Sequence, residues 1–318
     1  MRNNIRPYFW KVLERLTGVN YYTAKAYYMF RQHRFCRNHV ETPLIIYQMG
    51  KVGSRTIFNS LQRLQLDMPI YHTHGLTQNY IDEKEIRSKR YFGTDESDFI
   101  HLTVPWKSQY LRNLIKRGFD GKKCKVVTVV RDPIAVNISS FFERIDKVDF
   151  TESWRTYTIK STKDEYEYKG RIDDMESLKS LFFEKCAHNE SLTFLDNELK
   201  SVFGVDVFES EFPKSEGYRI YEGEQVDVLL IRLESLNDCA KKAFNEFLNI
   251  EDFTLVNINI GSEKDYAYLY QKFKELVVLP DTYIDKMYRS KYAQHFYSKE
   301  EIDRFITKWR RLNKPLVT

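Results

Sequence analysis

Short apolar runs typical of buried strands alternate along the chain with longer segments that have the spacing of amphipathic helices. The predicted strands occupy residues 43–49, 68–74, 98–104 and 125–130, with a hairpin over 218–236 whose turn lies at 222–224. The predicted helices occupy 54–66, 106–118, the segment after 132, 175–204, 235–248, 263–277, 281–290 and 298–310. This pattern predicts an α/β fold with a central parallel sheet flanked by helices and a helical C-terminal third.

Two segments fall outside the alternation. Residues 149–175 are polar and rich in tyrosine and show no clear period, so we expect a long surface excursion or lid. Residues 1–41 form a basic, aromatic N-terminal segment that we expect to be helical. The predicted organisation is therefore this segment followed by one domain over 42–318.

The positive charge of the chain is concentrated at its start. Residues 1–41 contain eight Lys and Arg against two Glu, a net of +6, while the whole chain has a net charge of +5. Aromatic residues are interleaved with these basic residues, a combination that suits a membrane surface or an acidic polymer. The plainer interpretation is one or two surface helices with a solvated basic face. Peripheral membrane contact through residues 1–41 stays an open expectation, and nucleic acid is not the expected partner.

Bulk properties exclude some classes of protein. No apolar run approaches 18 residues and no secretory signal is recognisable, which predicts a cytoplasmic protein, at most attached to a membrane surface. The four cysteines show no CxxC or zinc-like spacing, so reduced thiols and the absence of a metal site are expected.

Residues 43–62, "PLIIYQMGKVGSRTIFNSLQ", combine a buried strand, a glycine-rich turn and a helix start. Glycines allow close backbone approach, and the free N–H groups of a helix start attract anions. The turn is not a Walker A loop, because Ile45 stands where that loop has its first glycine and Val52 follows Lys51 in place of the hydroxyl that holds magnesium. The turn therefore predicts a phosphate site of another kind.

A second anion-binding element follows the strand at 125–130. In "VVTVVRDPIAVNISS", Arg131 ends the strand, Asp132 can cap a helix whose first residue is Pro133, and Ser139 lies two turns into that helix. Open parallel sheets bind ligands at the carboxyl ends of their strands. Two anion sites on one edge predict a ligand with two separated phosphate groups.

These two motifs, together with "LLIRLESL" at 229–236, resemble the PAPS-dependent sulfotransferase family, with coverage from about residue 43 to 310. The resemblance implies a P-loop-like sulfotransferase fold. The helices around "KYAQHFYSKEEIDRFITKW" are most similar to bacterial sulfotransferase-like proteins of capsular polysaccharide synthesis.

The resemblance also implies individual roles. Binding of the 5′-phosphosulfate falls to a set in the first turn, namely Lys51, Gly53, Ser54, Arg55 and Thr56. Binding of the 3′-phosphate falls to Arg131 and Ser139. The Arg-Lys-Gly motif that completes this second site in the family is absent here, and Lys286, Arg289 or Lys291 are the candidate substitutes.

Sulfuryl transfer needs a base for the acceptor hydroxyl and positive charge for the leaving phosphate oxygen, and it requires no metal. Lys51 is suited to neutralise the negative charge that develops on the leaving phosphate oxygen. "IYHTHG" at 70–75 ends the second strand and is similar to the His-x-His of heparan and dermatan 2-O-sulfotransferases, which implies that His74 is the base and His72 supports it. Without that resemblance both are ordinary polar residues at a strand end.

The prediction is an enzyme of the EC 2.8.2 type that moves sulfate from PAPS to a hydroxyl, by preference on a carbohydrate or polysaccharide. Two alternatives remain open at this stage: a metal-dependent P-loop kinase or NTPase, and a non-catalytic module that binds through its basic arm. The acceptor, the hydroxyl position and the oligomeric state do not follow from the sequence.

Overall fold

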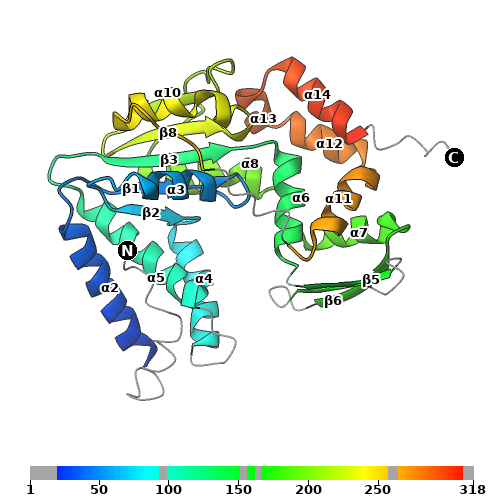
Figure 1. The fold of residues 1–318 in the computed structure, drawn as a ribbon, viewed down its shortest axis with the longest axis horizontal. Coiled ribbons are helices and arrows are strands. Elements are labelled where there is room, and N and C mark those ends of the chain that lie inside the picture. Colours follow the sequence, from blue (N-terminus) through cyan, green and yellow to red (C-terminus); the bar gives the residue numbers. More distant parts are fainter. Residues whose placement is uncertain are drawn as a thin grey trace.

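The computed structural model describes residues 20–92, 99–145, 147–150, 156–161, 166–256 and 264–310. Its centre is a five-stranded sheet of order β2-β1-β3-β8-β7 (Figure 1). The strands are β1 (Leu44–Tyr47), β2 (Ile70–Thr73), β3 (Cys124–Val130), β7 (Tyr218–Glu222) and β8 (Val226–Arg232). β2, β1, β3 and β8 are parallel, and β7 pairs antiparallel with β8 in the predicted hairpin. The predicted α/β class is confirmed.

Helices cover both faces of the sheet, as near-continuous apolar strands require. On one face His72 contacts α3 (Ser54–Arg63), and Lys125 donates to the Phe247 carbonyl of α10 (Leu236–Leu248) at 2.6 Å. On the other face Tyr47 packs against α8 (Glu190–Phe194), and Thr73 contacts α5 (Phe99–Arg117). Because β2, β1, β3 and β8 are parallel, their carboxyl ends all lie at the same edge of the sheet.

The helix after β3 begins as predicted. Asp132 caps α6 (Pro133–Glu143) by accepting from the Ile134 N–H at 3.0 Å, and Pro133 occupies the first turn. The C-terminal third is helical as well. It consists of α11 (Ala267–Leu276), α12 (Asp281–Tyr288), α13 (Lys291–Phe296) and α14 (Lys299–Arg310).

The predicted strand at 98–104 is wrong. Within the described residues this stretch is the start of α5, which continues through Pro105. The apolar residues that suggested a strand belong to a longer helical stripe, because Leu102, Trp106 and Tyr110 are buried at four-residue intervals. Packing between α4 (Gln78–Tyr91), α5 and β2 therefore overrode the local preference.

The polar segment at 149–175 is more regular than expected. β4 (Lys147–Phe150), β5 (Thr156–Ser161) and β6 (Tyr166–Arg171) form a small antiparallel sheet. In β5, Tyr157, Ile159 and Ser161 are buried while the intervening residues are more exposed, which is a two-residue period. This sheet packs with α7 (Met175–Lys185), next to α11 in Figure 1.

The predicted helix at 175–204 is interrupted. After α7 the chain continues as α8, one π-helical segment (η1, Leu195–Lys200) and α9 (Ser201–Phe203). It stops at Gly204, whose φ is 72°, as the sequence predicted. A π-helical turn inside a helix is uncommon and often marks a functional position.

The described part of the N-terminal segment is one helix, α2 (Tyr21–Arg37), which packs on α5. Tyr21 and Ala24 are buried against Trp106, whose indole N–H donates to the Tyr21 hydroxyl at 2.7 Å. Among the helices described, none has the combination of length and hydropathy that a membrane span requires.

Candidate anion-binding active site

The turn after β1 has the backbone of an anion cradle. Lys51 and Gly53 have φ angles of 66° and 81°, which lie in the left-handed region. Gly53 is also the residue before α3, so the turn leads directly into a helix N-terminus. A Cβ on Gly53 would come within 2.6 Å of a terminal methyl of Leu233, which would have to shift, so it is mainly the positive φ that favours a glycine there.

The first turn of α3 offers donors to this cradle. The first N–H groups of a helix lack intrahelical acceptors and lie at the positive end of its dipole. Thr56 N–H already donates to the Gly53 carbonyl at 3.1 Å. Ser54 is buried and Arg55 is exposed, so Arg55 is the more accessible side chain for a ligand.

Arg131 joins the two predicted anion sites. Its guanidinium Nη1 donates to the Lys51 carbonyl at 2.7 Å, which ties the end of β3 to the turn after β1. Its own backbone is held by Tyr292, whose hydroxyl accepts from the Arg131 N–H and donates to the Arg131 carbonyl, both at 2.9 Å. The two motifs are thus one continuous site.

A buried polar network supports Arg131 from behind. The Asp132 carboxylate, 2% exposed, accepts from Tyr288 at 2.8 Å and from the Trp309 indole at 3.2 Å. The Asp132 N–H donates to Glu234 at 2.8 Å. This network fastens the turn after β8, α12 and α14 to the end of β3, so the C-terminal third positions the Arg131 backbone.

Lys51 is paired with an acidic residue that the sequence left without a role. Its ammonium lies 3.1 Å from the Glu143 carboxylate, which also accepts from Tyr266 at 2.6 Å and lies 3.7 Å from Lys264. Burial lowers the pKa of Lys51, and Glu143 partly offsets that effect. Although burial opposes it, hydrogen bonds and charge from Tyr266, Lys51 and Lys264 lower the pKa of Glu143 to about 2.

Ser139 lies on the same face of α6 as Glu143, because residues four apart stack on a helix. Since Glu143 reaches Lys51, this face is turned toward the site. Ser139 is half-buried and makes no side-chain hydrogen bond with the residues that the structure describes. Among the described residues Ser139 makes no hydrogen bond with Arg131 or Lys51, so its part in the site stays a prediction.

The two histidines lie at the end of β2, beside the same turn. Their rings are 4.8 Å apart and edge to face. His72 Nε2 is 2.9 Å from the Ser54 hydroxyl, and His74 Nδ1 is 2.9 Å from the Gln48 carbonyl oxygen. A carbonyl only accepts, so His74 carries its proton on Nδ1 and keeps the lone pair on Nε2.

Both histidines are held neutral. Burial, followed by the charges of His74, Lys107 and Arg55, lowers the pKa of His72 to about 3. The surrounding protein also desolvates the His74 imidazole and lowers its pKa, even though His74 is exposed at the surface. A neutral, accessible imidazole with a fixed tautomer is suited to accept a proton.

Lys107 of α5 was not singled out in the sequence. Its ammonium donates to the His72 carbonyl, and burial lowers its pKa to about 8. It fixes the end of β2 and adds positive charge below the two histidines. A single lysine in a helix cannot be recognised from the sequence as one that contacts the end of β2.

A carboxylate from the π-helical segment fixes the turn after His74. Glu198 accepts hydrogen bonds from the Leu76 N–H at 3.0 Å and the Thr77 N–H at 3.1 Å. It also accepts from the hydroxyls of Tyr47 and Thr77. One side chain thus connects β1, η1 and the turn that carries His74.

None of the three suggested basic substitutes contacts Arg131. Lys286 is exposed, Arg289 pairs with Asp285 at 3.2 Å, and Lys291 lies 3.9 Å above the Phe208 ring. Lys274 of α11 is close enough to Arg131 for burial and then repulsion from that guanidinium to lower its pKa. Lys274 is therefore a further candidate for the cation beside Arg131, and the sequence pattern did not indicate it.

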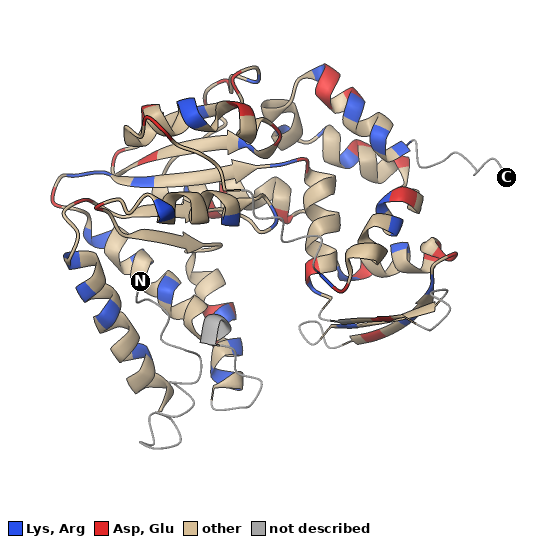
Figure 2. Cartoon of the chain, viewed as in Figure 1, with Lys and Arg blue, Asp and Glu red and all other residues tan. Residues whose placement is uncertain are grey.

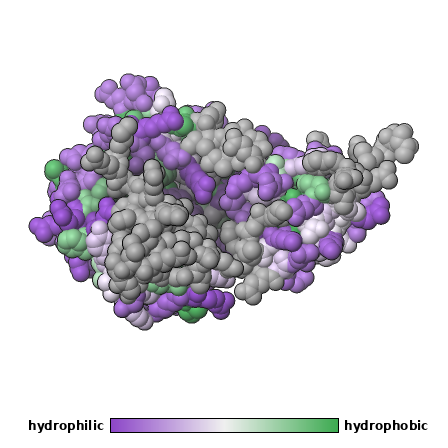
Figure 3. Space-filling model, turned by 60° about the horizontal axis from the view of Figure 1, so that its bottom comes forward, coloured by the Kyte–Doolittle hydropathy of each residue, from purple (hydrophilic) through white to green (hydrophobic). Residues whose placement is uncertain are grey.

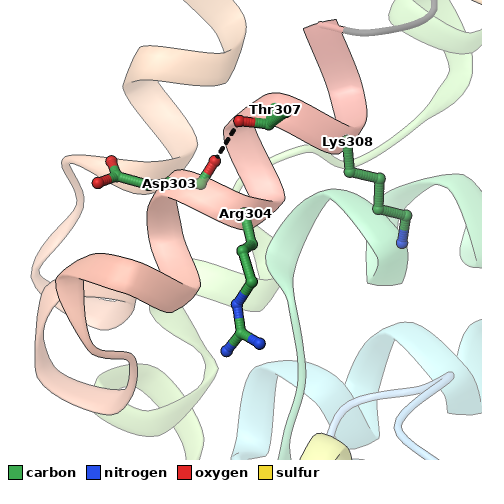
Figure 4. A pocket seen from close by; sticks show the side chains of 4 residues that line it. All are labelled: Asp303, Arg304, Thr307 and Lys308. Carbon is green, nitrogen blue, oxygen red and sulfur yellow. Dashed lines mark hydrogen bonds between the residues drawn. The ribbon is translucent and has the colours of Figure 1, made fainter.

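Positive charge dominates around this edge, where Lys51, Arg131, Lys264 and Lys274 converge. Figure 2 shows how Lys and Arg are distributed over the described chain, and Figure 3 shows a mostly hydrophilic described surface with only scattered apolar patches. A separate shallow pocket on α14 is lined by Asp303, Arg304, Thr307 and Lys308 (Figure 4). No predicted site residue lines that pocket.

Fold and geometry define a class: a mostly parallel α/β protein in which the two predicted anion-binding motifs meet at one edge of the sheet, with two histidines beside them. Residues 170–298 match the NKWYS family model, described as "Putative capsular polysaccharide synthesis protein". No curated protein and no solved structure gives a significant match. The matched segment excludes Lys51, His74 and Arg131, but it contains Glu198, Glu234 and Tyr292, which hold the turns that carry them.

The pKa of His72 predicts a loss of stability in acid. A histidine that stays neutral when folded, with a pKa of about 3, takes up a proton near pH 6.5 when unfolded. Acidification therefore favours the unfolded state, and between pH 7 and 5 we expect His72 to lower the free energy of unfolding by about 2 kcal/mol. Urea denaturation of the wild type and His72→Gln at both pH values measures this. An equal pH dependence in the two proteins would contradict the burial of a neutral His72.

Proposed function

We propose that this protein transfers sulfate from PAPS to a hydroxyl group, by preference on a carbohydrate. The observation that carries the proposal is the 2.7 Å hydrogen bond from Arg131 to the Lys51 carbonyl, which makes one site of two anion-binding motifs. A ligand with two separated phosphate groups, one at each motif, would match that arrangement. The neutral His74 at the next strand end adds the base that transfer to a hydroxyl needs.

The chain's donor set suits the proposed sulfate donor. Gly53, Ser54, Arg55 and Thr56 would surround the 5′-phosphosulfate with backbone N–H groups and one arginine. Arg131, Ser139 and Lys274 would meet the 3′-phosphate. Val52 is fully buried, so the position that carries a magnesium-binding hydroxyl in a Walker A loop is apolar and inaccessible here.

In the proposed reaction, His74 Nε2 takes the proton of the acceptor hydroxyl as its oxygen forms a bond to sulfur. The bond from sulfur to the bridging phosphate oxygen breaks, and that oxygen leaves with the electron pair on adenosine 3′,5′-bisphosphate. Lys51 stabilises the negative charge on this oxygen. To do so it turns from Glu143 toward the ligand, while Lys264 stays near the carboxylate.

The carbohydrate acceptor is supported by the family description over 170–298 and by the exposure of His74 at the surface. Among the described residues of 149–175, some aromatic side chains are accessible for stacking on sugar rings and others are not. Tyr157 is buried and packs inside the small sheet, whereas Tyr166 and Tyr168 are partly exposed. Trp154 lies outside the described residues.

Calorimetric titration without metal tests the donor site. We expect the wild type to bind adenosine 3′,5′-bisphosphate, and to bind 5′-AMP, which lacks the 3′-phosphate, at least tenfold more weakly. Labelled PAPS with a panel of oligosaccharides then tests transfer. Binding of ATP with magnesium in place of the bisphosphate would favour the kinase or NTPase alternative and would overturn the proposal.

A further inference from the structure

The outer face of α2 combines exposed aromatic rings with uncompensated positive charge. Tyr22 is 66% exposed and Phe30 is 56% exposed. At about 100° per residue, Tyr22, Phe30 and Arg37 form a stripe about 80° wide on one side of the helix. Arg34 lies beside this stripe, and both arginines are exposed.

Packing of the opposite face of α2 against the domain fixes which face of the helix points outward. Tyr21 and Ala24 are buried against Trp106, and Phe35 lies 6.2 Å from Tyr71 of β2 between ring centroids. The inner face therefore has partners of its own and holds the helix on the domain. The outer aromatic rings remain exposed although this packing is complete.

The charge on α2 has one sign. The helix contains Lys25, Arg31, Arg34 and Arg37 and no Asp or Glu. Glu85 of α4 pairs with Lys25 at 2.9 Å, which leaves the three arginines toward the C-terminal end. The helix dipole explains a preference for cations there, but it does not explain exposed tyrosine and phenylalanine on the same face.

We propose that the outer face of α2, defined by Tyr22, Phe30, Arg34 and Arg37, binds the surface of an anionic lipid bilayer. Phenylalanine and tyrosine enter the boundary between headgroups and acyl chains, while arginines pair with lipid phosphates. This combination fits a membrane better than a nucleic acid, whose backbone offers phosphate but no apolar layer. The inference is independent of the proposed sulfate transfer.

Vesicle cosedimentation of the full chain tests this surface. We expect binding to phosphatidylcholine vesicles that contain phosphatidylglycerol and weak binding to phosphatidylcholine alone. Arg34→Gln with Arg37→Gln should weaken binding about tenfold or more, and so should Tyr22→Ser with Phe30→Ser. Residues 1–19 are unchanged in every variant, so the comparison isolates α2.

Matched controls are available on the same protein. Lys241→Gln with Lys242→Gln removes two exposed charges from α10, and Ile86→Ser removes an equally exposed apolar side chain from α4. Both should bind vesicles like the wild type, and circular dichroism checks that every variant is folded. Equal binding to both kinds of vesicle, or losses no larger in the α2 variants than in the controls, would overturn the proposal. Binding of duplex DNA or an acidic polysaccharide without vesicle binding would overturn it too.

Discussion

Replacing Arg131 with alanine should reduce the affinity for adenosine 3′,5′-bisphosphate about 100-fold. The guanidinium is expected to meet the 3′-phosphate by charge-assisted hydrogen bonds, which are the strong ones. It also holds the Lys51 carbonyl at 2.7 Å, so the variant loses a ligand contact and loosens the phosphate turn at once. Metal-free calorimetric titration of the two proteins measures the loss.

A second ligand separates these two effects. 5′-AMP lacks the 3′-phosphate. If the direct contact between Arg131 and that phosphate dominates, Arg131→Ala should weaken the binding of 5′-AMP much less than that of the bisphosphate. Comparing the two proteins with the two ligands is equivalent to a double-mutant cycle. Arg289→Ala is the matched control, because Arg289 is exposed and pairs only locally with Asp285. Equal losses for both ligands would show that Arg131 acts on the turn alone, and an equal loss in Arg289→Ala would count against the assigned site.

Replacing Glu198 with alanine should destabilise the protein by about 3 kcal/mol and reduce any histidine-dependent activity. The carboxylate accepts from two backbone N–H groups and two hydroxyls around Leu76 and Thr77. Removing it leaves the Thr77 N–H and the hydroxyls of Tyr47 and Thr77 without this acceptor, whereas the Leu76 N–H keeps the Tyr47 hydroxyl at 3.2 Å. His74 lies two residues before Leu76, so we expect its orientation to relax. Urea denaturation measures the first effect, and the rate of acylation of His74 by diethyl pyrocarbonate measures the second.

Two further variants show whether Glu198 acts on His74 or only on stability. Glu198→Gln keeps an acceptor oxygen and should recover part of both properties. Asn197→Ala changes the exposed neighbour in the same π-helical segment and should change neither. Bisphosphate binding should survive in Glu198→Ala, because the hydrogen bonds of Glu198 go to Tyr47, Leu76 and Thr77 and not to the 50–56 turn or Arg131. A large loss of stability with an unchanged His74 reactivity would mean that Glu198 is purely structural.

Much of the fold was predictable because local signals agreed. β1 and β3 are continuous apolar runs, and the Asp132 cap with Pro133 marks the start of α6 as the sequence indicated. The strand prediction for 98–104 was wrong because a short apolar run fits a strand or a buried helix equally well. The small sheet at β4 to β6 was missed although β5 has a two-residue period, since its residues are mostly polar.

In the candidate site, too, some residues could be predicted from the sequence and others could not. His72, His74, the turn at 50–56 and Arg131 were predictable, because each follows a strand and parallel strands end at one edge. Their partners were not. Glu143, Glu198 and Tyr292 lie 92, 151 and 161 positions from the residues they hold, which are Lys51, Tyr47 and Arg131 respectively.

The sequence by itself determined the strands of the central sheet, most of the helices, the glycine turn before α3 and the basic aromatic start of the chain. These depend on periodicity, glycine conformation and helix capping, which act over a few residues. Only the tertiary structure decided that Arg131 holds the turn after β1, which carboxylates hold Lys51 and the His74 turn, and which face of α2 stays exposed. Those choices depend on contacts between distant segments, where side-chain packing and the desolvation of charges set the outcome.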